Sequence, residues 1–188
     1  SSTADLLEVA LSFNPAEARY EATQSFAQAG RYTLTFYARD NRGELSPTVQ
    51  AVLSGPDAYE DDDAREAAGY LDVGETQFDH NFDSASDEDW VRFYAVSGQF
   101  YQVDVEQQGT NVDVQLDLWW ERPDGTLTNI DPDVDIEDDG VGCLESTGMN
   151  LSNNADWGEG FYYLRVSSAN TAMWGVDSDY DVIVSVPV

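Results

Sequence analysis

Acidic side chains dominate the residues of this sequence that could take part in chemistry. Asp and Glu number 37 against eight basic residues, all of them Arg, and the formal net charge is −29. Clustered carboxylates can bind a hard cation such as Ca²⁺, whereas dispersed carboxylates form a solvated, self-repelling surface that suits salty surroundings. We expect the solvated surface to account for most of the acids, which suggests a marine or halophilic source. The charge also repels phosphate backbones and anionic membranes, so nucleic acid is not an expected partner.

Residues that could serve catalysis are few. The single histidine, His80, lies in the strand-like segment QFDHNF, and the single cysteine, Cys143, has no histidine near it in the sequence. No nucleophile motif such as G-x-S-x-G accompanies them, and a zinc site would have to rely on carboxylates. We therefore interpret His80 as a packed or surface histidine and Cys143 as a small buried hydrophobe. No enzymatic activity is expected.

Two stretches concentrate the acidic residues. The segment DAYEDDDA at 57–64 follows Ser-Gly-Pro and is interpreted as an extended linker, because like charges repel one another. The second stretch, 131–139, has D-x-D-x-D spacing with Gly140 after it and resembles part of an EF-hand loop. The glycine is misplaced for that motif, so a solvated loop is favoured there and a bound cation is the weaker alternative.

Adjacent aromatic residues raise the possibility of a binding surface. In the pairs Trp119-Trp120 and Tyr162-Tyr163, one member must face away from the core if the segment is a strand. Two further tryptophans lie beside glycine in loop-like sequence. Exposed aromatic rings could stack on a sugar or clamp a peptide, although a second sheet or a loop could instead cover them. The candidate ligand-binding residues are Trp119, Tyr162, Trp157 and Trp174.

The elements that must position these residues are strands. Between Gly98 and Gly125, apolar residues alternate with polar ones in two runs, 101–105 and 112–120, as in half-buried strands. The sequence QQGTN joins the runs, and Arg-Pro-Asp-Gly after the second predicts a type I turn. We expect the remaining strands to add to this central pair in an all-β antiparallel sandwich. No run of about 18 apolar residues is present, so no membrane span is expected.

The first 54 residues form a separate unit in this prediction. Strand-like segments at 7–13, 19–26, 32–38 and 48–53 precede Ser-Gly-Pro. The phrase FAQAGRYTLTFYARDNRGELSPTVQAVLS resembles the closing strands of bacterial immunoglobulin-like modules, which implies a partial Ig-like β-sandwich unit. A complete module needs about 100 residues. We infer that the chain begins inside a domain or that this unit leans on its neighbour.

From Asp57 onward, five motifs occur in a recognisable order. They are D-A-Y-E-x-D-D, S-D-E-D-W-V-R-F, VDVQLDLWWERPDGT, G-x-x-Y-Y-L-R-V and YDVIVSV. This order resembles the bacterial pre-peptidase C-terminal domain, a jelly-roll-like β-sandwich found beside the catalytic domains of secreted proteases. The resemblance covers about 130 residues. It implies a linker at 55–63 and a sandwich at 64–188.

In collagen-binding relatives of that family, the acidic linker and the D-x-D turn together bind Ca²⁺. When the ligand positions of those relatives are matched to the motifs of this sequence, the resemblance implies a calcium site made of Glu60, Asp62, Asp63, Asp87 and Asp89. Ca²⁺ takes six to eight oxygen ligands, so carboxylates from two segments could pin the linker to the sandwich. The alternative is a solvated linker without a cation. With two matched acidic segments, calcium is slightly favoured.

The resemblance implies a function in binding and spacing. The chain is expected to be the non-catalytic C-terminal accessory region of a secreted bacterial hydrolase, with a peptidase favoured, and to act beside an upstream catalytic domain of the same polypeptide. Its partners could include an extracellular protein or a polysaccharide. Two alternatives remain open at this point: a structural or adhesive module of a surface protein, and a tail that assists export and is cleaved off.

Overall fold

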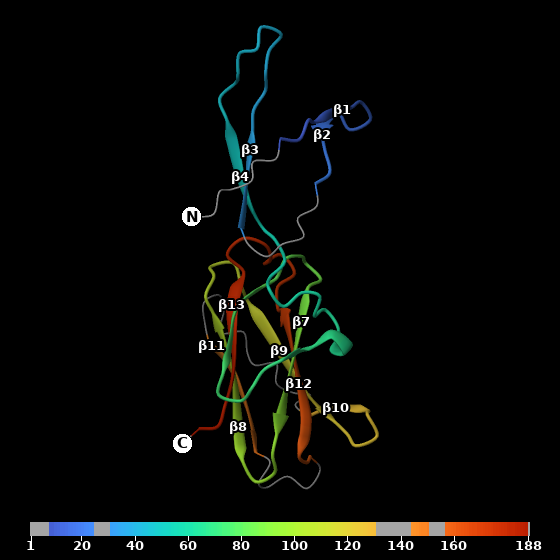
Figure 1. Cartoon of the computed structure of the whole chain (residues 1–188), viewed down its shortest axis with the longest axis vertical. Helices are drawn as coiled ribbons and strands as arrows, with labels where there is room; N and C mark the ends of the chain where they lie inside the picture. The colour runs from blue at the N-terminus through green and yellow to red at the C-terminus, as the bar shows by residue number, and fades with distance from the viewer. Residues whose placement is uncertain (1–7, 25–30, 131–143, 151–156, 188) are drawn as a thin grey trace.

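The computed structural model describes residues 8–24, 31–130, 144–150 and 157–187. Within these ranges, the regular elements are strands and one short 3₁₀ helix (Figure 1). In chain order they are β1 (Ser12–Asn14), β2 (Arg19–Glu21), β3 (Arg31–Phe36), β4 (Val49–Ser54), η1 (Arg65–Ala67), β5 (Gly69–Tyr70), β6 (Thr76–Asn81), β7 (Glu88–Ala95), β8 (Phe100–Gln107), β9 (Val114–Glu121), β10 (Leu127–Asn129), β11 (Leu144–Asn150), β12 (Gly160–Ser168) and β13 (Asp179–Ser185).

Two sheets form the sandwich. One has five strands in the order β10-β9-β12-β7-β5, and the other has four in the order β11-β8-β13-β6. Neighbouring strands are antiparallel, except that β5 pairs with β7 in parallel. The predicted all-β antiparallel sandwich is confirmed. No described helix is long and apolar enough to cross a bilayer.

The core lies between the inner faces of the two sheets. Alternate residues of β7, β9 and β12 face alternate residues of β8 and β13, as the period of two along a strand requires. Val91, Phe93, Leu164 and Val184 are among the side chains that have no exposed surface at all. Burial of this apolar layer stabilises the fold, and the polar residues between its members face outward.

The two runs of the central segment do not pair with each other. β8 belongs to the four-stranded sheet and β9 to the five-stranded sheet, so the predicted central pair is wrong. The QQGTN connection crosses between the sheets, and the backbone N–H groups of Gln108 and Gly109 donate to the carbonyl of Asp179. A Cβ atom on Gly109 would lie 1.8 Å from the carbonyl oxygen of Asp177. Glycine is required there for close backbone approach.

The turn predicted at Arg-Pro-Asp-Gly is present, and it makes a hairpin that the sequence did not suggest. The N–H of Gly125 donates to the carbonyl of Arg122 at 2.8 Å, and Gly125 has φ 83°. The chain then returns as β10, which pairs antiparallel with the end of β9. Strand β11 (Leu144–Asn150) pairs antiparallel with β8 at the edge of the four-stranded sheet.

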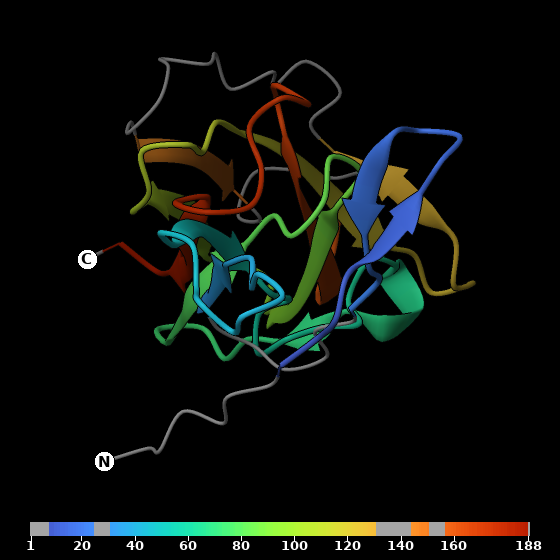
Figure 2. The same cartoon turned by 90° about the horizontal axis from the view of Figure 1, so that it is seen from above.

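The N-terminal part contains two small hairpins, β1–β2 and β3–β4, which are separate two-stranded sheets. Figure 1 shows both hairpins beyond one end of the sandwich, and Figures 1 and 2 show β1–β2 to one side of β3–β4. The side chain of Arg31 at the base of β3 forms ion pairs with Asp177 and Asp179 of the sandwich. The division into 1–54, 55–63 and 64–188 stays a prediction, as does the Ig-like character of the first unit.

Candidate metal centre

The acidic linker is fixed to the sandwich at its beginning. The carboxylate of Asp57 accepts hydrogen bonds from the backbone N–H of Tyr59 at 2.7 Å and from that of Asn81 in β6 at 3.0 Å. The hydroxyl of Tyr59 accepts a hydrogen bond from the N–H of Phe78, and its ring stacks on His80 with the centroids 4.1 Å apart. The linker therefore follows the surface of β6 instead of extending freely into solvent.

Downstream of Tyr59, linker carboxylates meet carboxylates from the turn between β6 and β7 and from the start of β7. Ligand atoms of Glu60, Asp62 and Asp89 lie within 4.8 Å of one another, and so do those of Glu60, Asp83 and Asp87. A backbone hydrogen bond of 3.0 Å from the N–H of Trp90 to the carbonyl of Asp62 holds the two segments in register. Five carboxylates from two distant segments thus surround one region.

Several of these oxygens are buried without a partner. Asp62 is 1% exposed and Asp89 is fully buried. Neither oxygen of Asp62 has a hydrogen-bond partner, and Oδ1 of Asp89 has none either. A buried carboxylate is strongly destabilising unless a cation or hydrogen-bond donors compensate for the loss of water. The arrangement therefore favours a bound cation.

The same burial of carboxylates raises the pKa values of these acids. Burial, followed by the nearby charge of Asp89, raises the pKa of Glu60 to about 7, that of Asp62 to about 8 and that of Asp87 to about 9. Burial also raises the pKa of Asp83. Without a cation, part of this cluster would carry protons at neutral pH.

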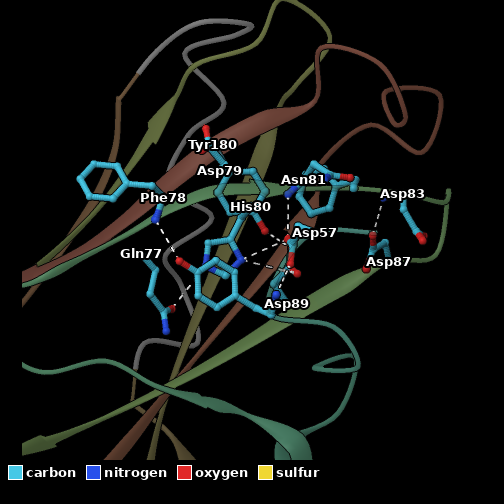
Figure 3. Close-up of polar contacts among 12 residues, drawn as sticks. Asp57, Gln77, Phe78, Asp79, His80, Asn81, Asp83, Asp87, Asp89 and Tyr180 are labelled. Carbon is cyan, nitrogen blue, oxygen red and sulfur yellow. Dashed lines mark hydrogen bonds and ion pairs between the residues drawn. The ribbon is translucent and has the colours of Figure 1, made fainter. Parts of the chain in front are cut away.

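Next to this cluster, His80 lies at the centre of a second polar group, drawn in Figure 3. Nδ1 of His80 is 3.5 Å from Oδ2 of Asp57 and 3.8 Å from Oδ1 of Asp89. The hydroxyl of Tyr180 donates to the other oxygen of Asp89. Burial alone would lower the pKa of His80, but the facing carboxylates of Asp57 and Asp89 raise it to about 9.

Four of the five predicted calcium ligands come together in the structure. Glu60, Asp62, Asp87 and Asp89 lie in the clustered sets, whereas Asp63 is exposed and lies outside both. A carboxylate oxygen of Asp63 instead accepts a long hydrogen bond of 3.4 Å from the N–H of Glu88. The fifth clustered carboxylate belongs to Asp83, which motif matching missed because it precedes the matched D-x-D segment.

The predicted aromatic ligand-binding residues are scattered. Tyr162 is fully buried in the core, so its prediction as a surface residue is wrong. Trp157 is partly buried and packs against the core, while Trp174 is exposed in the loop before β13. Trp119 does lie on the outer face of the five-stranded sheet, where register pairs it with Tyr163.

A compact aromatic group on that outer face was not predicted. The ring of Phe161 on β12 packs edge to face against the rings of Tyr94 on β7 and Tyr70 on β5. The ring centroids are 5.2 Å apart for Tyr94 and 6.5 Å apart for Tyr70. The guanidinium of Arg92 lies over Phe161 at 5.7 Å. Tyr70, Tyr94 and Phe161 are each more than a third exposed. We call this group, with Arg92, the outer aromatic surface.

Comparison with known proteins gives similarity in structure only. No protein-family model matches the sequence, and no curated protein matches it. The pre-peptidase C-terminal domain of collagenase from Bacillus anthracis is similar over 62% of this chain and 93% of its own, with 13% identity and a TM-score of 0.40. CorA, a surface-associated copper-binding protein of Methylomicrobium album BG8, is similar over 64% of this chain and 98% of its own, with 9% identity and a TM-score of 0.38.

A carbohydrate-binding module of the β-sandwich superfamily is similar over 93% of this chain and 81% of its own. The identity is 12% and the TM-score 0.28. At identities this low, the roles of individual side chains must be inferred from the contacts within this chain.

Proposed function

We propose that this chain is a non-catalytic accessory region of a secreted bacterial hydrolase, with a peptidase favoured, and that Ca²⁺ fastens its linker to the β-sandwich. The observation that carries the calcium proposal is the convergence of Glu60 and Asp62 from the linker with Asp83 and Asp87 from the β6–β7 turn and Asp89 from the start of β7. Carboxylate oxygens are the donors that Ca²⁺ prefers.

The burial of these carboxylate oxygens and their lack of hydrogen-bond partners favour a bound cation over a solvated linker. A solvated acidic linker would leave its carboxylates in water, but Asp62 and Asp89 are buried and three of their oxygens have no partner. Ca²⁺ bound by this set would supply the missing positive charge. It would also hold residues 60–62 against the β6–β7 turn, so that the sandwich keeps a defined direction relative to whatever precedes the linker.

Thermal melts test the calcium site. The protein is unfolded in excess chelator and again in millimolar Ca²⁺, with high salt held constant. A ligand at 100 times its Kd stabilises the folded state by about 2.7 kcal/mol, which corresponds to a rise in Tm of about 5–10 °C for a chain of this size. No change in Tm would contradict the proposal.

A double variant identifies the ligands. Glu60→Ala combined with Asp87→Ala should abolish the calcium response while the sandwich still folds, because neither side chain belongs to the apolar core. The matched control combines Glu66→Ala with Asp72→Ala, which removes the same two residue types from exposed positions outside the cluster. An unchanged calcium response in the Glu60/Asp87 variant would show that the ligand set is wrong.

The outer aromatic surface is the best candidate for the binding role. Partly exposed aromatic rings can stack on sugar rings or on the side chains of a protein fibre. Phe161→Ala should weaken retention on an insoluble polysaccharide or on fibrous collagen at least about tenfold, as expected when a central aromatic contact of about 1.4 kcal/mol or more is lost. Tyr20→Ala, an exposed aromatic on the β1–β2 hairpin, is the control. Equal retention of both variants would remove this surface from the proposal.

Two other roles predict different observations. A catalytic domain encoded before residue 1 would support the accessory role, and its absence would favour a structural or adhesive module. Recovery of a mature protein that lacks these residues would instead favour a cleaved export tail.

A further inference from the structure

The group around His80 has the composition of a second metal site, distinct in chemistry from the carboxylate cluster. Asp57 from the linker, His80 from β6 and Asp89 from β7 present ligand atoms within 4.8 Å of one another. His80 and Asp89 have no exposed surface, and Asp57 is 6% exposed. The three residues come from three separate segments that only the folded sandwich brings together, as Figure 3 shows.

The hydrogen bonds of Gln77 fix the state of the imidazole. The amide nitrogen of Gln77 donates to the carbonyl of Tyr70, so its amide oxygen is the atom that faces Nε2 of His80 at 3.3 Å. Nε2 must therefore carry a hydrogen and donate it. In a neutral imidazole, the other nitrogen, Nδ1, then has a lone pair and no hydrogen.

That lone pair is directed at negative charge. Nδ1 has no hydrogen-bond partner, and the two oxygens nearest to it belong to the carboxylates of Asp57 and Asp89. Three electron-rich atoms facing one another in a buried space repel unless a positive charge lies between them, either a proton on Nδ1 or a metal cation. The separations of 3.5 and 3.8 Å from Nδ1 are close to the roughly 3.4 Å between two ligands of a tetrahedral ion with bonds of about 2.1 Å.

The surroundings hold each ligand in place. An imidazole that binds a metal through one nitrogen usually donates the N–H of the other nitrogen to an acceptor. The amide oxygen of Gln77 is that acceptor here. The hydroxyl of Tyr180 and the backbone N–H of Asn81 donate to the carboxylates of Asp89 and Asp57. The rings of Tyr59 and Tyr180 stack on the imidazole, with ring centroids 4.1 and 5.5 Å from its centroid, and restrict its rotation.

We propose that His80 Nδ1, Asp57 and Asp89 bind a borderline d-block cation of the Zn²⁺ type, separately from the calcium cluster. A nitrogen donor distinguishes this group from a calcium site, because Ca²⁺ is bound almost entirely by oxygen whereas imidazole suits zinc and its neighbours. Asp89 belongs to both groups and places the two cations side by side. The zinc-type ion fastens the first part of the linker, at residue 57, and calcium fastens the part around residues 60–62.

Calorimetric titration of the calcium-saturated protein with Zn²⁺ tests the site, and Co²⁺ provides a spectroscopic check of nitrogen coordination in visible absorption. One equivalent should bind. His80→Gln and Asp57→Asn should each weaken binding at least about 100-fold, and Gln77→Leu, which removes the outer hydrogen bond to His80 together with the hydrogen bond to the carbonyl of Tyr70, by about 10- to 100-fold. The matched control is Asp79→Asn, an exposed neighbour whose φ of 62° suits asparagine.

Each variant is also melted with and without Ca²⁺, so that loss of folding is distinguished from loss of a ligand. A His80→Gln protein that melts cooperatively, keeps its calcium response and no longer binds Zn²⁺ would support the site. Unchanged Zn²⁺ binding in His80→Gln would overturn it. So would the absence of Zn²⁺ binding to the parent protein, which would leave a protonated imidazolium as the cation, and so would Zn²⁺ binding that occurs only by displacing Ca²⁺.

Discussion

In the sandwich, Phe93 and Leu164 have no exposed surface, whereas in the hairpin β3–β4 Phe36 is 42% exposed and Val49 67% exposed. Both regions are built from alternating strands with similar residue types. Among the described residues of β1–β4, no hydrophobic side chain is buried. The two regions differ in layers: the sandwich has two facing sheets, and each N-terminal hairpin is a single two-stranded sheet.

This difference shows that an alternating sequence gives a strand an apolar face, but that the face is buried only when a second layer packs against it. An isolated two-stranded hairpin is marginally stable in water, because its apolar face needs a second layer to be removed from solvent. Among the described residues, the junction between the two regions includes the acidic linker and the ion pairs of Arg31. The hairpins therefore contribute little to the stability of the sandwich, and this expectation can be tested residue by residue.

The largest expected difference comes from matched leucine truncations. Leu164→Ala in β12 removes a fully buried side chain and should lower the free energy of unfolding by about 2–5 kcal/mol. Leu53→Ala in β4, where the side chain is 40% exposed, should change it by no more than about 0.5 kcal/mol. Chemical denaturation followed by tryptophan fluorescence measures both. Similar effects would mean that the hairpins and the sandwich unfold as one unit.

The junction should respond to pH when metals are removed. The raised pKa values of Glu60, Asp62 and Asp87, about 7, 8 and 9, mean that the folded protein binds more protons than the unfolded chain between about pH 4 and pH 9. His80, with its pKa raised to about 9, acts in the same direction. Stability of the metal-free protein should thus fall as pH rises through this range.

Melts of the metal-free protein at pH 5, 7 and 9 measure this fall, and the same series in saturating Ca²⁺ is the control. Calcium should reduce the decline because it replaces the protons as the compensating positive charge. A metal-free Tm that stays level or rises from pH 5 to pH 9 would contradict the burial of these carboxylates.

The smallest expected effect concerns Arg31. Its guanidinium and the partner carboxylates of Asp177 and Asp179 are all more than a third exposed, and such ion pairs contribute about 0–1 kcal/mol. Arg31→Ala should leave the Tm of the sandwich nearly unchanged but increase the rate at which protease cleaves the hairpin region. Arg42→Ala, in the exposed turn between β3 and β4, is the control. A drop in Tm of several degrees would show that the two regions are energetically coupled.

The sequence by itself determined the class of the fold and most of its strands. The alternation in β7, β8, β9, β12 and β13 marks each strand and its buried face, because a period of two is a local property of an extended chain. Four of the five calcium ligands predicted from the motif resemblance also cluster. The positions of short β5 and β10 could not be predicted, because a strand of two or three residues has no period.

Only the tertiary structure decided which strands are neighbours and which polar groups meet. β8 and β9 are adjacent in sequence but lie in different sheets, and QQGTN contains nothing that distinguishes a crossover from a hairpin. Of two adjacent tyrosines, Tyr162 faces the core and Tyr163 the other side, a choice set by register with β7 and β9. His80 meets Asp57 and Asp89 because three segments pack together. Local sequence determines the conformation of each strand, but long-range packing determines which side chains share a buried space.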